Sequence, residues 1–135
     1  IASQVAVSAG ATGATDVTGF GLLGHLGKMA LTSNVEAVLD VANIAFLPGA
    51  KQYAEDGVIP GGTRRNLAWV ENQIDAGSFS ETDLLLLADA QTSGGLIFGV
   101  EKTKSVEVCA ELNERAVAAM VVGETHEGKG TIRLR

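Results

Sequence analysis

The chain has 135 residues, of which 46% are hydrophobic, 4% aromatic and 19% charged, and its formal net charge is −6. A chain of this length suits one domain, and its apolar fraction excludes an intrinsically disordered protein. The acid excess argues against nucleic acid or an anionic membrane as a partner and is explained by a solvated acidic surface.

The first half of the chain predicts helices separated by small-residue loops. Apolar residues recur at helical spacing at the N-terminus, where Gly10 would end the helix, and again from Thr18 onward. We expect a helix over 1–10, a loop over 10–15, a helix from Thr18, a strand over 35–41 and a Pro-led helical turn over 47–57.

The second half alternates glycine-containing loops with apolar runs. Ser80, followed three residues later by Asp83, resembles a capping box that begins a helix. We expect a glycine loop over 60–66, a helix or strand over 67–74, a helix over 80–90, a buried strand over 94–100, a helix over 104–115, and strands over 118–124 and 131–135.

This order of elements predicts an α+β fold, in which a mixed β-sheet is packed with helices. No repeat or linker divides residues 1–135, so we expect a single domain. No apolar run approaches the roughly 18 residues that cross a membrane, and no signal peptide opens the chain. Cys109, the single cysteine, rules out an intrachain disulfide, favours a cytoplasmic location and is expected to be a buried, inert thiol. The chain starts without Met, as though inside a helix, which predicts a fragment of a longer protein.

The stretch ATDVTGFGLLGHLGKMA, residues 14–30, contains G-x-G-x-x-G at Gly19, Gly21 and Gly24. A dinucleotide-binding loop needs a strand immediately before the first glycine, and the mostly small residues of 8–18 do not predict one. Asp40 does lie at the distance of a ribose-binding acid. Close helix packing at Gly24 and Gly27, one turn apart, is the simpler interpretation.

Asp16 precedes the predicted helix and has two interpretations. Its carboxylate could cap the helix N-terminus by accepting a backbone N–H. It could also bind a hard cation, because Mg²⁺ uses one or two carboxylates together with substrate phosphates, which a nearby helix N-terminus would favour. Residue types alone favour the cap.

Other polar residues have ordinary structural explanations beside functional ones. Thr92 and Ser93 could bind phosphate or shape a turn, and Arg64 and Arg65 could contact phosphate or be solvated. His25, alone on the predicted helix, is more typical of a structural than a catalytic histidine.

Three motifs in this order resemble the C-terminal half of selenophosphate synthetase (selenide, water dikinase): TDVTGFGLLGH at 15–25, GGTRRN at 61–66 and QTSGGL at 91–96. The ending, VVGE followed by a polar turn and a strand, fits the same family, so the resemblance covers essentially the whole chain. This family belongs to the aminoimidazole ribonucleotide synthetase superfamily, whose members pair an N-terminal ATP-binding domain with a C-terminal α+β domain.

The resemblance implies an enzyme that converts ATP, selenide and water to selenophosphate, AMP and phosphate with Mg²⁺ as cofactor. The reactive Cys or selenocysteine and most ATP contacts would lie in the N-terminal half, so no catalytic residue is expected in this chain, and the chain alone should be inactive. The C-terminal half would contribute one metal-binding aspartate, Asp16, with Thr15, Thr18 and Gly19 near the phosphates. The implied partners are the N-terminal domain and a second copy in a homodimer.

Two positions depart from the family pattern. Ala14 stands where the family usually has Cys, and Ala90 stands where it has Pro, which could change the rigidity of that loop. Two alternatives stay open: a related ATP-dependent synthetase with a different substrate, and a non-catalytic nucleotide-binding or interaction module.

Overall fold

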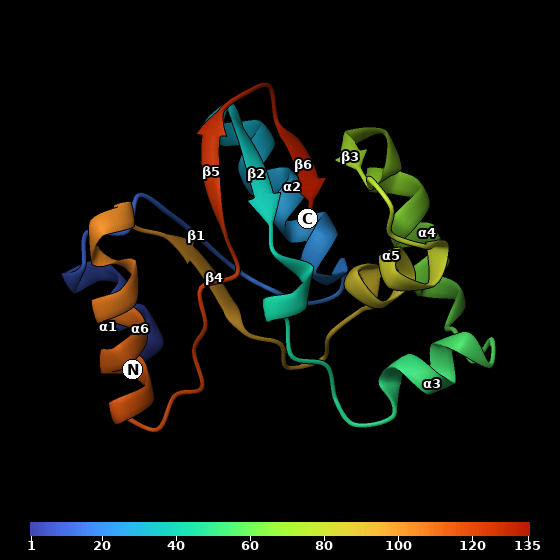
Figure 1. The fold of residues 1–135 in the computed structure, drawn as a ribbon, viewed down its shortest axis with the longest axis horizontal. Coiled ribbons are helices and arrows are strands. Elements are labelled where there is room, and N and C mark those ends of the chain that lie inside the picture. Colours follow the sequence, from blue (N-terminus) through green and yellow to red (C-terminus); the bar gives the residue numbers. More distant parts are fainter.

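The computed structural model describes residues 1–135, with six α-helices and six strands in two separate sheets (Figure 1). The helices are α1 (Ala2–Ser8), α2 (Gly21–Ser33), α3 (Ala50–Glu55), α4 (Gly61–Val70), α5 (Glu81–Ala88) and α6 (Ser105–Glu114). The strands are β1 (Gly13–Asp16), β2 (Val35–Leu39), β3 (Ile74–Asp75), β4 (Leu96–Gly99), β5 (Gly123–Glu127) and β6 (Thr131–Leu134). None of the helices combines the length and apolar character needed to cross a membrane.

A four-stranded mixed sheet with the order β3-β6-β2-β5 forms the centre of the molecule. Strand β2 runs parallel to β6, with Leu39 opposite Leu134, and antiparallel to β5, with Val35 opposite Glu127. The two C-terminal strands are therefore not hydrogen-bonded to each other, because β2 lies between them (Figure 1). The mixed sheet and its helices confirm the predicted α+β fold.

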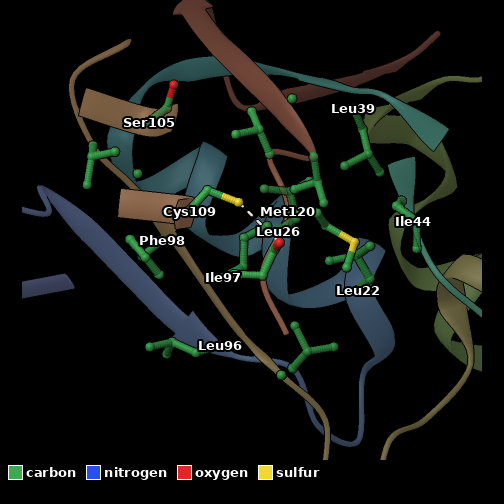
Figure 2. Close-up of a pocket in the computed structure, with 18 of the residues that line it drawn as sticks. Leu22, Leu26, Leu39, Ile44, Leu96, Ile97, Phe98, Ser105, Cys109 and Met120 are labelled. Atoms are coloured by element: carbon green, nitrogen blue, oxygen red, sulfur yellow. Dashed lines mark hydrogen bonds between the residues drawn. The ribbon is translucent and has the colours of Figure 1, made fainter. Parts of the chain in front are cut away.

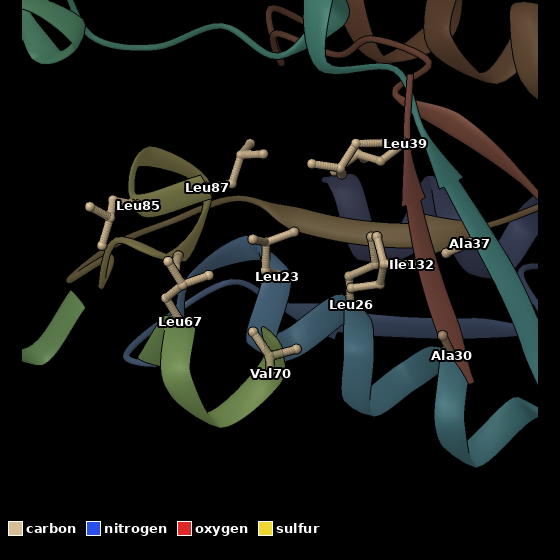
Figure 3. Close-up of a cluster of buried hydrophobic side chains, with 12 residues drawn as sticks. Leu23, Leu26, Ala30, Ala37, Leu39, Leu67, Val70, Leu85, Leu87 and Ile132 are labelled. Atoms are coloured by element: carbon tan, nitrogen blue, oxygen red, sulfur yellow. The ribbon is translucent and has the colours of Figure 1, made fainter. Parts of the chain in front are cut away.

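The main core lies between α2 and the four-stranded sheet, with α4 and α5 on the other side of α2 (Figure 3). Leu23 and Leu26 of α2 meet Ile132 of β6 there, and Leu23 and Ile132 are fully buried. The predicted apolar face of α2 is correct for Leu23, Leu26 and Ala30, but Phe20 lies before the helix and is exposed.

A smaller unit contains the antiparallel ribbon of β1 and β4 together with α1 and α6 (Figure 1). Its own core consists of Val5, Val108 and Leu112. The register runs from Gly13 opposite Gly99 to Asp16 opposite Leu96. The ribbon thus joins the β1–α2 connection to the end of the α5–β4 connection.

Several predicted elements are confirmed with small shifts of their ends. Capping of α5 is as predicted, since Ser80 accepts the backbone N–H of Asp83 and the Asp83 carboxylate accepts the N–H of Ser80. The predicted elements over 1–10, 35–41, 47–57, 104–115 and 131–135 correspond to α1, β2, α3, α6 and β6.

Four predictions of secondary structure are wrong. Residues 13–16 form β1 instead of a loop, because β4 offers a ladder to a sequence with little strand propensity of its own. Residues 61–66 belong to α4, which begins directly after Pro60 despite two glycines. Helix α2 begins at Gly21 instead of Thr18, and β5 lies at 123–127 instead of 118–124, where it pairs with β2. The predicted buried strand over 94–100 is β4, and its side chains are half-buried.

Candidate functional site

Asp16 is the last residue of β1, and its side chain is exposed. No hydrogen bond or ion pair engages its carboxylate, and the neighbouring Thr15 hydroxyl donates to the Asp16 backbone carbonyl at 3.0 Å. The predicted position at a helix mouth is wrong, since α2 begins five residues later with Phe20 as its N-cap and without a side-chain cap. This excludes helix capping by Asp16 or Thr18 and leaves the Asp16 carboxylate free.

The loop after Asp16 lies directly against the α5–β4 loop, residues 89–95. The backbone N–H of Val17 donates to Gly95 at 2.8 Å, and that of Gln91 donates to Thr18 at 3.0 Å. A Cβ atom added to Gly94 would lie 2.0 Å from the Val17 carbonyl oxygen. The two loops are therefore packed backbone to backbone, with no room for a side chain between them.

Helix α4 ties these two loops together. The Asn66 side-chain amide donates to the carbonyl oxygens of Gly19, at 2.9 Å, and Ala88, at 3.1 Å. One turn earlier, the hydroxyl of the buried Thr63 donates to the Asp89 carboxylate. Thus, the three motifs, which are far apart in the sequence, meet at one place in the fold.

Gly21 and a cluster of aromatic side chains also pack around the β1–α2 loop. Gly21 has a φ of +69°, and a Cβ atom there would lie 2.5 Å from the Ala88 carbonyl group, so the turn into α2 requires glycine. The ring of Phe20 lies 5.6 Å from that of Trp69 and 5.8 Å from that of His25, whose Nε2 is 3.1 Å from the Thr18 hydroxyl. These contacts of His25 with Phe20 and Thr18 are those of a structural histidine.

The other polar residues singled out in the sequence are spread over exposed surfaces. Arg64 and Arg65 lie on α4 instead of a loop, and Arg64 pairs with Glu81 at 3.5 Å. Thr92 and Ser93 are exposed in the α5–β4 loop. No hydrogen bond of their hydroxyl groups defines a binding geometry, so a phosphate contact there stays a prediction.

The structure argues against a dinucleotide-binding site at the glycine motif. A strand, β1, does precede Gly19, but it pairs antiparallel with β4, and the next strand, β2, belongs to the other sheet. A β-α-β unit needs both strands parallel in one sheet. Asp40, the candidate ribose ligand, is held by two hydrogen bonds from Arg135, which lower the pKa of its carboxyl group. The interpretation as close packing is supported at Gly27, where an added Cβ would approach Val70 to 3.0 Å.

An apolar cavity of about 440 Å³ adjoins the β1–α2 and α5–β4 loops, together called the motif loops, at Val17 and Gly95 (Figure 2). It is bounded by β4 and α6 on one side and by α2 and β2 on the other, and 23 of its 29 lining residues are hydrophobic. Cys109 faces it and is half-buried instead of fully buried, with its thiol donating to the Ala119 carbonyl at 3.1 Å. Such a lining has no arrangement of polar groups for a phosphate, so the candidate site stays at the exposed loops.

The residues of this chain could supply one ligand of a Mg²⁺ site, but not a complete site. Asp16 provides a free, exposed carboxylate oxygen, the hard donor that Mg²⁺ prefers. No group of three or more His, Cys, Asp or Glu side chains is arranged to hold a metal ion. The chain can thus supply one ligand, and the others have to come from a substrate or another polypeptide segment.

Sequence patterns alone indicate no role for Asn66, Thr63, Asp89 or Gly94. The available signal was that Thr63, Asn66 and Gly94 lie inside the quoted motifs and that Asp89 lies two residues before the third of them. Only the tertiary structure shows that these motifs contact one another.

A family model described as AIR synthase related protein, C-terminal domain, matches residues 1–135. The chain is 41% identical over 132 residues to a selenide, water dikinase of Carboxydothermus hydrogenoformans, covering 97% of the chain and 38% of that protein. It is 40% identical over 116 residues to the protein of the same name in Myxococcus xanthus, covering 85% of the chain and 33% of that protein. The chain therefore spans about a third of the length of the curated relatives it matches, and the resemblance found in the sequence is confirmed.

Proposed function

Because the chain belongs to the family of AIR synthase related C-terminal domains, we propose that it is the C-terminal domain of a selenide, water dikinase. The complete enzyme would convert ATP, selenide and water to selenophosphate, AMP and phosphate. One observation supports a role for Asp16 in this enzyme: its free carboxylate lies where the three motifs meet.

In this proposal Asp16 binds a Mg²⁺ ion that neutralises charge developing on the ATP phosphates. Thr15, Thr18 and Gly19 lie beside the phosphates. The aspartate stands at the end of a strand whose backbone is fixed by β4 and by the α5–β4 loop. Its backbone is therefore set before the ligand arrives, which lowers the ordering cost of binding.

The remaining metal ligands and the reactive residue would belong to an N-terminal ATP-binding domain. A carboxylate supplied from a second domain couples the approach of the two domains to metal binding, and this favours chemistry only in the closed state. This chain alone, a single domain over residues 1–135, would be inactive. We expect the complete protein to be a cytoplasmic homodimer.

The test is Asp16→Asn in the full-length protein, because an amide keeps the shape and removes the charge. We expect ATP turnover to fall at least about 100-fold, while the free energy of unfolding changes by less than about 0.5 kcal/mol. Asp56→Asn, at an exposed carboxylate after α3, is the matched control and should leave turnover unchanged. Near-normal turnover in Asp16→Asn would disprove the assignment.

A second candidate is a related ATP-dependent synthetase with a different substrate, because the matching family model is described by its relation to AIR synthase. Phosphorus NMR of the products formed with ATP and selenide separates the two. A signal of selenophosphate supports the first candidate, whereas ATP consumption that does not depend on selenide supports the second.

A further inference from the structure

Asn66 is the residue of α4 whose side chain bonds both the β1–α2 loop and the end of α5, where the α5–β4 loop begins. Its Nδ2 atom donates one hydrogen to Gly19 in the β1–α2 loop and the other to Ala88, the last residue of α5. Carbonyl groups in the last turn of a helix have no partner inside the helix, so the Ala88 carbonyl needs an outside donor. One amide thus satisfies a helix end and fixes a loop three residues from Asp16.

The rest of the contact between the loops is backbone to backbone. Gly21 and Gly94 bring main chains together so closely that an added Cβ would lie 2.5 Å from the Ala88 carbonyl or 2.0 Å from the Val17 carbonyl oxygen. The Thr18 carbonyl accepts two backbone N–H groups, from Gly21 and Gln91, both at 3.0 Å. Two side chains of α4 add to these backbone contacts. Thr63 holds the α5–β4 loop through Asp89, and the Asn66 amide links the β1–α2 loop to the end of α5.

We propose that Asn66 is a positioning residue, whose amide holds the β1–α2 and α5–β4 loops together so that the Asp16 carboxylate is presented in one place. This rests on the proposed metal role of Asp16. Asn66 itself contacts neither metal nor substrate. Its effect passes through Gly19 and Thr18 to the end of β1.

The decisive variant is Asn66→Asp in the full-length protein. The ionised carboxylate has the same shape but cannot donate, so the oxygen atom in the place of Nδ2 would face the carbonyl oxygens of Gly19 and Ala88. A new negative charge near Asp16 would by itself attract a cation more strongly. If Asn66→Asp binds a divalent cation more weakly, the Asp16 carboxylate has lost its position, because the added charge alone would strengthen binding. Asn66→Ala removes the two hydrogen bonds without adding charge.

The matched control is Asn43→Asp. Asn43 is exposed beyond β2 and donates to the Val121 carbonyl at 3.1 Å, so the change is chemically identical but lies outside the motif loops. Two measurements need no turnover: hydrogen exchange followed by mass spectrometry for segments 17–24 and 88–95, and Mn²⁺ binding followed by electron paramagnetic resonance.

We expect both Asn66 variants to accelerate exchange in these two segments about tenfold and to weaken Mn²⁺ binding about tenfold, which matches the usual effect of losing a residue that orients a metal ligand. Segment 35–39 in β2 and the Asn43→Asp protein should not change. Unchanged exchange in 17–24 would overturn the role in holding the loops. Faster exchange with unchanged Mn²⁺ affinity would overturn the role in positioning Asp16, provided that Asp16→Asn itself weakens Mn²⁺ binding.

The two proposals fail in distinguishable ways. If Asp16→Asn binds Mn²⁺ normally, the metal role of Asp16 is wrong, and with it the positioning of that ligand. The exchange measurement then still decides whether Asn66 holds the loops. If Asp16→Asn loses Mn²⁺ and Asn66→Asp does not, the proposed function stands and the inference on Asn66 is wrong.

Discussion

Gly94 lies directly against Val17, so that a Cβ atom on Gly94 would be 2.0 Å from the Val17 carbonyl oxygen. Position 94 therefore requires glycine because there is no room for a Cβ atom, and not because the chain has to be flexible there. The residue after Gly94 also links the β1–α2 and α5–β4 loops, because the carbonyl of Gly95 accepts the backbone N–H of Val17.

Gly94→Ala should therefore destabilise the protein strongly, by about 3 kcal/mol or more, since overpacking against rigid backbone cannot be relieved by a rotamer change. Gly95→Ala is the matched control, because an added Cβ at Gly95 meets nothing within 4 Å. We expect it to change stability by less than about 1 kcal/mol. Urea unfolding of both variants measures the difference, and equal midpoints would contradict the close approach of the loops.

Thr63 is the buried polar residue of the core, and its hydroxyl donates to the Asp89 carboxylate. Thr63→Val keeps the volume and removes the donor, so we expect a loss of about 1.5–3 kcal/mol, the range for a hydrogen bond to a charged group. A double-mutant cycle with Asp89→Asn, again by urea unfolding, isolates the pair. Additive effects of the two changes would show that the hydrogen bond contributes nothing to stability.

Sequence patterns predict the elements whose side chains decide their structure. The capping box of Ser80 and Asp83 is local and is confirmed. The apolar face of α2 is periodic and is confirmed except at Phe20, which lies before the helix. Strand β1 has neither property, since Gly13, Ala14 and Thr15 become a strand only because β4 pairs with them. Similarly, 118–122 is more apolar than 123–127, yet the ladder with β2 forms on the latter.

The same limit applies to the candidate site. Asp16 could be proposed as a metal ligand because a carboxylate in a characteristic motif is visible in the sequence. Its free state, its place at a strand end and its link to Asn66 depend on contacts between segments about 50 and 75 residues apart, and no local pattern encodes them. The structure adds a reason for proposing Asp16 as a ligand: its carboxylate is free because it does not cap α2, which begins at Gly21.

Leu23 of α2 is fully buried in the main core, together with residues of α5 and β6 (Figure 3). Leu31 on the same helix is half-exposed. Leu23→Ala should cost about 2–5 kcal/mol through lost burial and a residual cavity. Leu31→Ala makes the identical change at the surface and should cost about 1 kcal/mol or less. The difference between the two in urea unfolding tests the packing of α2. Similar losses of stability in Leu23→Ala and Leu31→Ala would show that the buried face of α2 is assigned incorrectly.

Glu124 is the second residue of β5, lies opposite Val38 of β2, and accepts hydrogen bonds from Lys102, at 2.9 Å, and Arg135, at 3.1 Å. These bonds lower the pKa of Glu124 from 4.5 to about 2, with Lys102 contributing most. Because the folded state holds the proton more weakly than the unfolded state, the stabilisation is fully present above pH 4.5 and is lost as the pH falls toward 2.

Glu124→Gln should accordingly reduce the loss of unfolding free energy between pH 6 and pH 3, and Lys102→Met should reduce it in part. High salt should shrink the effect in the unmodified protein, because exposed ion pairs are screened. Urea unfolding at the two pH values, with and without 1 M salt, measures all three. A pH dependence that is the same in Glu124→Gln as in the unmodified protein would show that these ion pairs do not form in solution.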